Sequence, residues 1–323
     1  MTARQFSAGD RDVLEVCVPV ATLWTDPHAP RDVDAPALLD RPRVADWVTS
    51  MDAGVRKGLS GRTLSQLLLG EPVVVLAERD DWLQVATLWQ PASGDPRGYP
   101  GWVRRAHLGR PVGRSTGAAA YVITRTAACT LESGGAVTLS FGTVLWVDGV
   151  SEHAAHVLLP GGQRAEIPFA HVRLAHKNQQ RAYGPDDLLG AARQFLGLRY
   201  LWGGTSAWGL DCSGLVHLVY RAHGVVVPRD ARDQATAAGV TPVPVDAVAP
   251  GDLYFFARPG EAVYHVGFVS REVDREGVRW MLHAPEGGEL VEDAPMAPHR
   301  LLTLVGAGRV TKPDTGQIGH PVG

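Results

Sequence analysis

Short apolar runs separated by turns dominate the first half of the chain and predict strands rather than helices. The clearest runs occupy 14–20, 73–76, 82–88 and 101–103. Their length, and the turn residues that bound them, are typical of a small antiparallel barrel. Between about 31 and 60 the pattern changes to helical spacing, and the apolar residues that share one helical face there are Val44, Trp47, Val48 and Met51. The sequence therefore predicts a first barrel over 1–112 with a helical insertion at about 31–60.

The same rhythm returns in the next part of the chain as a weak internal repeat. Apolar runs recur at 142–147, 156–159, 167–168 and 172–174. These runs correspond, in the same order, to the runs between residues 70 and 108, although the spacing differs. We therefore expect a second barrel over 113–176, and the polar stretch 175–181 is expected to link it to a third domain.

The rest of the chain places helices before strands. Helix signals occur at 185–196, where a proline and two aspartates precede an apolar stripe, and again from about residue 212. Strand-like runs follow at 225–227, 253–256, 264–270, 278–283 and 301–310. This order predicts an α+β fold for 177–311 rather than a parallel α/β sheet, with a loose tail at 312–323.

A candidate nucleophile lies at the start of the second of these helices. Asp211 is the expected N-cap, and Cys212 follows it in the first turn. Free amide N–H groups and the helix dipole favour a thiolate at that position. An arbitrary cysteine among apolar residues is more often a packing residue, and we expect that role for Cys17 and Cys129. For Cys212, the glycine-rich approach at 197–204 and the histidines described next favour a nucleophile.

Two histidines supply the base that a cysteine nucleophile requires. His265 and His283 lie in neighbouring strand-like runs, and their midpoint, residue 274, falls inside a polar turn. A regular hairpin about that point brings them face to face, with Cβ atoms about 4.5–5.5 Å apart. One imidazole then accepts the cysteine proton and the other orients it, whereas a slip of one residue breaks the arrangement. A histidine pair at a solvated hairpin end is the competing interpretation.

These residues and their surroundings resemble a known family. The sequence has Asp-Cys-Ser-Gly on a helix, His-Val-Gly on a strand and then His-Ala, after the approach Tyr-Leu-Trp-Gly-Gly at 200–204. This order is similar to that of the NlpC-type, papain-like cysteine peptidases of bacterial cell-wall metabolism, over roughly 180–310. The resemblance implies a papain-like domain with Cys212 as nucleophile, His265 as base and His283 as orienting residue. It also implies that Tyr200 lies near the oxyanion.

The two barrels resemble tandem bacterial SH3-like modules, which often precede such peptidases. With the helical insertion, the whole resembles the γ-D-glutamyl-L-diamino acid endopeptidases of murein recycling, whose substrates are murein-derived peptides with a free N-terminal L-Ala. Asp230 matches the acid that receives this amine, in a turn at 228–230 expected to expose two opposite charges, although Ala231 replaces a family serine. Tyr99 is our candidate to lean over and close the cleft, and packing within its own barrel is an equal alternative. The other expected substrate-binding residues are Trp202, Asp211 and Ser213.

Composition narrows the possible partners. The 323 residues are 45% hydrophobic and 20% charged with a net charge of -3, so nothing indicates a nucleic-acid partner. No apolar run approaches 18 residues and the N-terminus lacks a signal-peptide core, so we expect a cytoplasmic protein with no membrane partner. Three cysteines do not form a secreted disulfide scaffold, and no cluster has zinc-ligand spacing. No metal or other cofactor is expected.

Three alternatives stay open. If a signal peptide was removed, the chain fits a secreted wall-remodelling endopeptidase that acts on intact peptidoglycan. A non-catalytic wall-binding protein with an inactive cysteine domain is the second, and an acyltransferase or amidase of the same fold is the third. The preferred diamino acid and the oligomeric state are not determined by the sequence.

Overall fold

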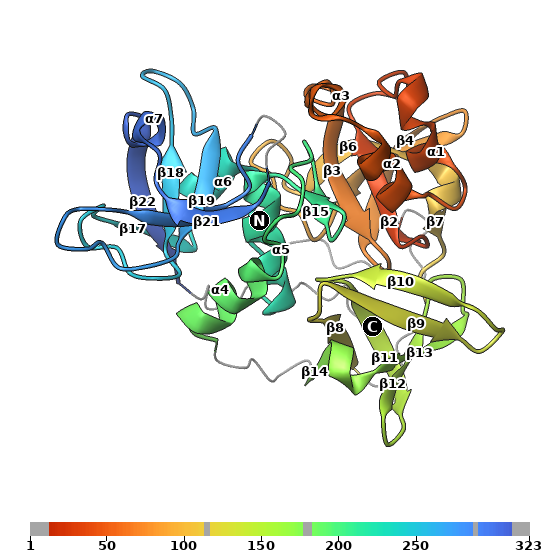
Figure 1. Ribbon diagram of the computed structural model, residues 1–323. Coiled ribbons are helices and arrows are strands. Elements are labelled where there is room, and N and C mark those ends of the chain that lie inside the picture. The colour runs from red at the N-terminus through yellow and green to blue at the C-terminus, as the bar shows by residue number, and fades with distance from the viewer. Residues whose placement is uncertain (1–12, 113–116, 177–182, 287–289, 312–323) are drawn as a thin grey trace.

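The computed structural model describes residues 13–112, 117–176, 183–286 and 290–311. This part of the chain is mostly antiparallel β with few helices, and it contains two seven-stranded sheets followed by a six-stranded one (Figure 1). The predicted tail at 312–323 and most of the predicted linker lie outside the described residues. Within those ranges no helix has the length and apolar character needed to cross a membrane.

The first sheet is built from the short apolar runs that the sequence shows. Its strands are β1 (Val13–Val16), β2 (Val20–Trp24), β3 (Thr63–Leu68), β4 (Pro72–Arg79), β5 (Trp82–Thr87), β6 (Tyr99–Arg104) and β7 (Leu108–Gly109). They pair in the order β3-β2-β6-β5-β4-β1-β7. Val16, Leu23, Val85 and Val103 belong to its buried apolar interior.

The segment between β2 and β3 forms several short helices where the sequence predicted one. They are the 3₁₀ turn η1 (Asp32–Asp34), α1 (Ala35–Leu38), α2 (Val44–Ser50) and α3 (Ala53–Lys57). The predicted apolar face of α2 is buried. Met51 adopts an extended conformation that ends α2, and Asp52 then starts α3 by accepting a hydrogen bond from the Val55 N–H at 2.8 Å. A capping aspartate therefore divides the helix that hydrophobic spacing alone would continue.

The second sheet repeats the topology of the first. Its strands are β8 (Ala118–Val122), β9 (Thr126–Leu131), β10 (Ala136–Ser140), β11 (Val144–Val150), β12 (Ala154–Leu158), β13 (Arg164–Pro168) and β14 (Val172–His176). They pair in the order β10-β9-β13-β12-β11-β8-β14. Numbered from the first strand of each sheet, both orders read 3-2-6-5-4-1-7. The repeat that the sequence shows only weakly is thus clear in the strand order.

The last part of the chain places helices before an antiparallel sheet. Its elements are α4 (Pro185–Arg193), β15 (Thr205–Ser206), β16 (Gly209–Leu210), α5 (Cys212–Ala222), α6 (Ala231–Thr236), β17 (Val240–Val243), β18 (Leu253–Phe256), β19 (His265–Val269), β20 (Trp280–His283), β21 (Glu292–Pro295), α7 (Pro298–Leu301) and β22 (Leu304–Val310). The six-stranded sheet has the order β17-β22-β18-β19-β20-β21, and α5 packs on β19.

The strand predicted at 225–227 is wrong. The Val225 N–H donates to the Tyr220 carbonyl, and the Val227 carbonyl contacts Nδ1 of His217 at 2.8 Å. Because α5 itself satisfies these backbone groups, the segment is held without a strand neighbour.

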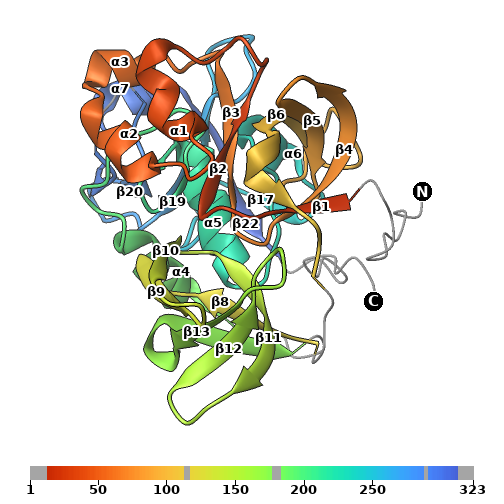
Figure 2. The same cartoon turned by 90° about the vertical axis from the view of Figure 1, so that its right-hand side faces the viewer.

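Helix α5 lies where the three parts of the molecule meet, as both ribbon views show (Figures 1 and 2). Arg221 on α5 forms a buried ion pair at 2.7 Å with Glu71, in the turn before β4. Leu218 packs against Gly142 of the second sheet so closely that a Cβ at Gly142 would lie 2.5 Å from the leucine Cδ1. Both sheets thus fix the helix that carries Cys212.

Candidate active site

The start of α5 is formed as the capping pattern predicts. Asp211 is the N-cap, and its Oδ1 accepts a hydrogen bond from the Gly214 N–H at 2.7 Å. Gly214 is required here, because a Cβ at this position would lie 2.1 Å from the Gly204 carbonyl oxygen. Cys212 is therefore the first residue of the helix, where its N–H has no intrahelical acceptor.

The two histidines meet, although the hairpin register differs from the predicted one. Phe268 pairs with Leu282, so the hairpin is symmetrical about residue 275 rather than 274. This places His283 across from Gly267, two residues from His265 and hence on the same face of the sheet. The absence of a side chain at Gly267 makes room, since a Cβ there would lie 2.8 Å from that of His283. The imidazoles are joined from His265 Nε2 to His283 Nδ1 at 2.8 Å.

Two carboxylates that sequence reasoning missed flank this histidine pair. Glu286 Oε2 lies 3.0 Å from His265 Nδ1 and 3.1 Å from the Arg300 guanidinium. At the other end, Glu292 Oε1 lies 3.2 Å from His283 Nε2. Glu292 stands opposite His283 in β21, a strand the sequence analysis did not predict. Only the pairing of β20 with β21 would have pointed to it, and this pairing cannot be read from hydrophobic spacing.

Burial controls the protonation of the nucleophile and the base. Burial, and then the charge of Asp211, raises the pKa of the Cys212 thiol to about 12, which outweighs the opposite effect of nearby backbone groups. The preformed thiolate expected from the helix position is therefore not favoured. Burial also lowers the pKa of His265, with Glu286 opposing it, and lowers that of His283 to about 2. At neutral pH these shifts leave the Cys212 thiol protonated and the His265 imidazole neutral.

Cys212 lines a cleft of about 520 Å³ that lies between the last domain and the first sheet. The last domain supplies Tyr200, Trp202, Cys212, Ser213 and Asp230 to its walls, and the first sheet with its insertion supplies Thr25, Gly61, Thr63, Leu64 and Tyr99. Tyr200 is buried beside the nucleophile, and burial together with nearby negative charge raises the pKa of its hydroxyl. The Tyr200 hydroxyl therefore stays protonated and remains a donor.

Tyr99 packs partly against the core of its own barrel and also reaches across this cleft. Its hydroxyl donates a hydrogen bond of 2.9 Å to Asp230 Oδ2, from β6 to the N-cap of α6. Burial raises the pKa of Asp230, whereas the neighbouring Arg229 acts to lower it. The two residues expected at the closed end of the cleft are thus in direct contact.

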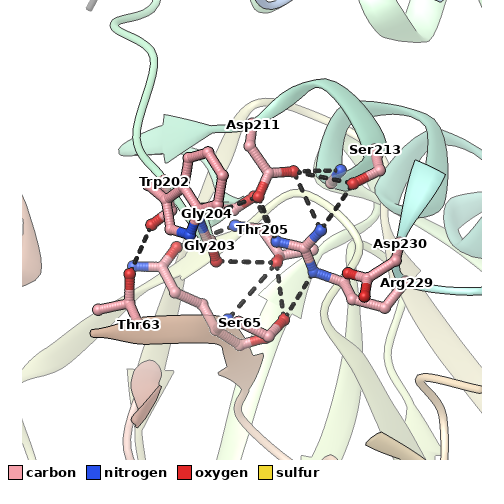
Figure 3. A network of polar contacts seen from close by, with 12 residues as sticks. Thr63, Ser65, Trp202, Gly203, Gly204, Thr205, Asp211, Ser213, Arg229 and Asp230 are labelled. Carbon is pink, nitrogen blue, oxygen red and sulfur yellow. Dashed lines mark hydrogen bonds and ion pairs between the residues drawn. The ribbon is translucent and has the colours of Figure 1, made fainter. Parts of the chain in front are cut away.

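A buried polar network surrounds Asp211 (Figure 3). Arg229, which the sequence placed in an exposed turn, is buried and binds both carboxylate oxygens of Asp211, at 2.7 and 3.0 Å. It also donates to Ser213 Oγ at 3.0 Å and to Ser65 Oγ of β3 at 2.8 Å. Asp211 and Ser213 both line the cleft of Cys212, and their polar side-chain atoms are at the same time held by groups of the chain itself. Their substrate-binding roles stay predictions.

Across the described ranges, no three His, Cys, Asp or Glu side chains are grouped so that they could hold a metal ion. A cysteine at a helix start, a buried imidazole pair on the neighbouring strands β19 and β20, and a hydroxyl donor beside the sulfur define the site of a cysteine hydrolase.

Comparison with known proteins identifies the family. The sequence model of the NlpC/P60 family matches residues 197–307. The chain is 36% identical over 281 residues to a γ-D-glutamyl-L-lysine dipeptidyl-peptidase of Bacillus subtilis, covering 84% of this chain and 90% of the relative. A protein of the same name from Bacillus cereus is 31% identical, and the match covers 90% of this chain and 89% of that relative. The chain belongs to the NlpC/P60 family and is a cysteine peptidase.

A solved structure agrees over nearly the whole chain. The crystal structure of an NlpC/P60 family protein from Bacillus cereus superposes with a TM-score of 0.86 at 29% identity. The match covers 93% of this chain and all of that one. The arrangement of two β sheets before the peptidase domain is therefore shared with a known member of the family.

Separate substitutions distinguish the roles of the two histidines. Because an unoriented base still transfers protons part of the time, His283→Ala is expected to lower kcat by about a hundredfold, less than His265→Ala does. His283→Asn keeps an acceptor for His265 Nε2 and should retain more activity than His283→Ala. Steady-state kinetics of the three variants test this. A greater loss in His283→Ala than in His265→Ala would exchange the two roles.

Proposed function

We propose that this protein hydrolyses the amide bond between γ-D-glutamate and an L-diamino acid in murein peptides that begin with a free L-alanine. The observation that carries the proposal is the partly buried carboxylate of Asp230, which accepts a hydrogen bond from Tyr99 in the same cavity as Cys212. The names of the two Bacillus relatives support it, since a dipeptidyl-peptidase removes two residues from a free N-terminus. Such an enzyme needs an acidic group for the terminal ammonium.

The chemistry proposed is acyl transfer through a thioester. Cys212 Sγ attacks the carbonyl carbon of the γ-glutamyl amide while His265 Nδ1 accepts the thiol proton. The same nitrogen then delivers this proton to the leaving amine, and later removes a proton from the water that hydrolyses the thioester. The Cys212 N–H and the Tyr200 hydroxyl are the donors proposed for the oxyanion of each tetrahedral intermediate. His283 holds His265 through the contact at Nε2.

The first sheet is proposed to act as an SH3-like module that limits substrate length. Tyr99 and Thr63 line the cleft from this sheet, so that a peptide still linked to glycan would meet them. We propose an SH3-like identity for the second sheet as well, on its identical strand order. A cleft closed in this way suits peptides already released from the wall, and on this ground we propose a cytoplasmic recycling enzyme rather than a wall-remodelling one.

The experiment compares free and blocked peptides. A charge-assisted hydrogen bond contributes about 1.5–3 kcal/mol, so Asp230→Asn should lower kcat/KM for L-Ala-γ-D-Glu-L-Lys by about ten- to a hundredfold. The N-acetylated tripeptide should be a poor substrate for both proteins. Asp246→Asn is the control, because its carboxylate is 87% exposed and lies outside the cleft residues.

Two outcomes would redirect the proposal. If the wild type cleaves the N-acetylated peptide or intact sacculi as fast as the free tripeptide, the protein is a wall-remodelling endopeptidase. If Asp230→Asn matches the wild type, the ammonium is bound elsewhere. A parallel assay with meso-diaminopimelate in place of lysine establishes which diamino acid is preferred.

A further inference from the structure

A carboxylate that lies outside the residues lining the cleft of Cys212 contacts the histidine pair. Glu292 stands directly across from His283 in the paired strands β21 and β20. Its Oε1 contacts Nε2 of His283 at 3.2 Å, and Nδ1 of the same ring contacts Nε2 of His265 at 2.8 Å. A single row of contacts thus runs from Glu292 through both imidazoles.

The carboxylate of Glu292, at one end of this row, determines which atom donates in each hydrogen bond. A carboxylate is only an acceptor, so His283 Nε2 carries the proton and donates to Glu292. The neutral ring then has a lone pair at Nδ1, which must accept the Nε2–H of His265. His265 Nδ1 is left with the lone pair that can take the proton of Cys212. The opposite order turns the lone pair of His283 toward a carboxylate and puts a proton on the nitrogen that must act as the base.

Glu286 opposes this order. It lies 3.0 Å from His265 Nδ1 and favours a proton there, yet this nitrogen has no aligned hydrogen-bond partner. Its charge is also offset by Arg300 at 3.1 Å. Glu292, by contrast, forms a hydrogen bond with His283 Nε2 at 3.2 Å, from a side chain that is 49% exposed. Glu286 contributes more after the thiol proton reaches Nδ1, because all three N–H groups of the row then face acceptors.

We propose that Glu292 is a positioning residue that fixes the tautomers of His283 and His265, and so leaves Nδ1 of His265 free to act as the base. The proposal rests on the cysteine peptidase mechanism given above. It adds a fourth member to the row of Cys212, His265 and His283, and this member never touches the substrate.

The location of Glu292 separates its effect from substrate binding. With His283, Glu286, His299 and Arg300 it lines a second cavity of about 170 Å³. None of the described residues lines both this cavity and the cleft of Cys212. A change at Glu292 should therefore alter kcat and leave KM for the tripeptide unchanged.

The test combines kinetics with the tautomer itself. Glu292→Gln preserves the shape but offers either an acceptor or a donor to His283, so kcat is expected to fall at least about tenfold with KM unchanged. Imidazole ¹⁵N spectra in a Cys212→Ala background should show both rings as Nε2–H tautomers when Glu292 is present. They should show a mixture in Glu292→Gln. Asp293→Asn is the control, because this neighbouring carboxylate binds Arg193 instead.

Each remaining outcome decides the question. An unchanged kcat in Glu292→Gln, or a loss confined to KM, overturns the proposal, as does an unchanged ¹⁵N spectrum. If Glu292→Gln does not fold, Glu292→Asp carries the same measurements, since it keeps the charge but shortens the reach to Nε2. Failure of the underlying mechanism is recognised separately, because His265→Ala would then remain active.

Discussion

Cys212→Ala is expected to lower kcat by about 10⁴- to 10⁶-fold, the range found when a covalent nucleophile is removed. The variant should still fold and bind the tripeptide. Cys212 is the first residue of α5 and lines the cleft, so its loss removes the attacking atom without disturbing the cap at Asp211. The measurement is single-turnover cleavage, with binding of the uncleaved tripeptide followed by calorimetry. Cys17→Ala and Cys129→Ala are the controls and should keep most of the activity.

Alkylation gives the same prediction a pH dependence. Because the thiol pKa is raised, the thiolate fraction at neutral pH is small. As long as the pH stays below this pKa, each increase of one pH unit raises the thiolate fraction about tenfold. Inactivation by iodoacetamide should therefore accelerate steeply between pH 7 and pH 9. A rate that is flat over this interval would indicate a preformed thiolate and imidazolium pair. Full activity after stoichiometric labelling of Cys212 would remove it from the mechanism altogether.

The position of the histidine pair could be predicted in part because side chains alternate between the two faces of a strand. The sequence placed the hairpin centre at residue 274 and the structure has it at 275. An error of one residue in the centre moves each partner by two, and residues two apart share a face of the sheet. His265 and His283 therefore still meet, diagonally, across the space left by Gly267.

Several polar partners around the site could not be predicted, because they come from distant parts of the chain. Arg229 and Ser65 are 164 residues apart, and Arg221 and Glu71 are 150 residues apart. Hydrophobic spacing shows which face of an element is buried, but not which charged group from another domain will meet it. The sequence correctly placed Asp211 as a cap, and wrongly left its partner Arg229, only 18 residues further along the chain, in an exposed turn.

Arg229 connects the nucleophile helix to the first sheet, and its charge compensates that of Asp211. The guanidinium binds both oxygens of this carboxylate and also reaches Ser65 on β3 (Figure 3). Asp211 in turn caps α5 and raises the pKa of Cys212. Without Arg229, the nearest negative charge to the thiol would be buried and unpaired.

Arg229→Met is therefore expected to lower the free energy of unfolding by about 3–5 kcal/mol, the cost of removing one partner of a buried ion pair. It should also lower kcat/KM, since an uncompensated Asp211 raises the thiol pKa further. Urea unfolding followed by tryptophan fluorescence measures the first effect, and alkylation of Cys212 across pH measures the second.

The control and the rescue separate charge from packing. Arg232→Met changes a neighbouring arginine whose side chain is 59% exposed and should shift stability by less than about 0.5 kcal/mol. Adding Asp211→Asn to Arg229→Met removes the stranded charge, so part of the lost stability should return even though the cap is weakened. If the double variant is less stable than Arg229→Met by the full cost of a lost cap, Arg229 acts through packing and its hydrogen bond to Ser65, and charge compensation of Asp211 is not its role.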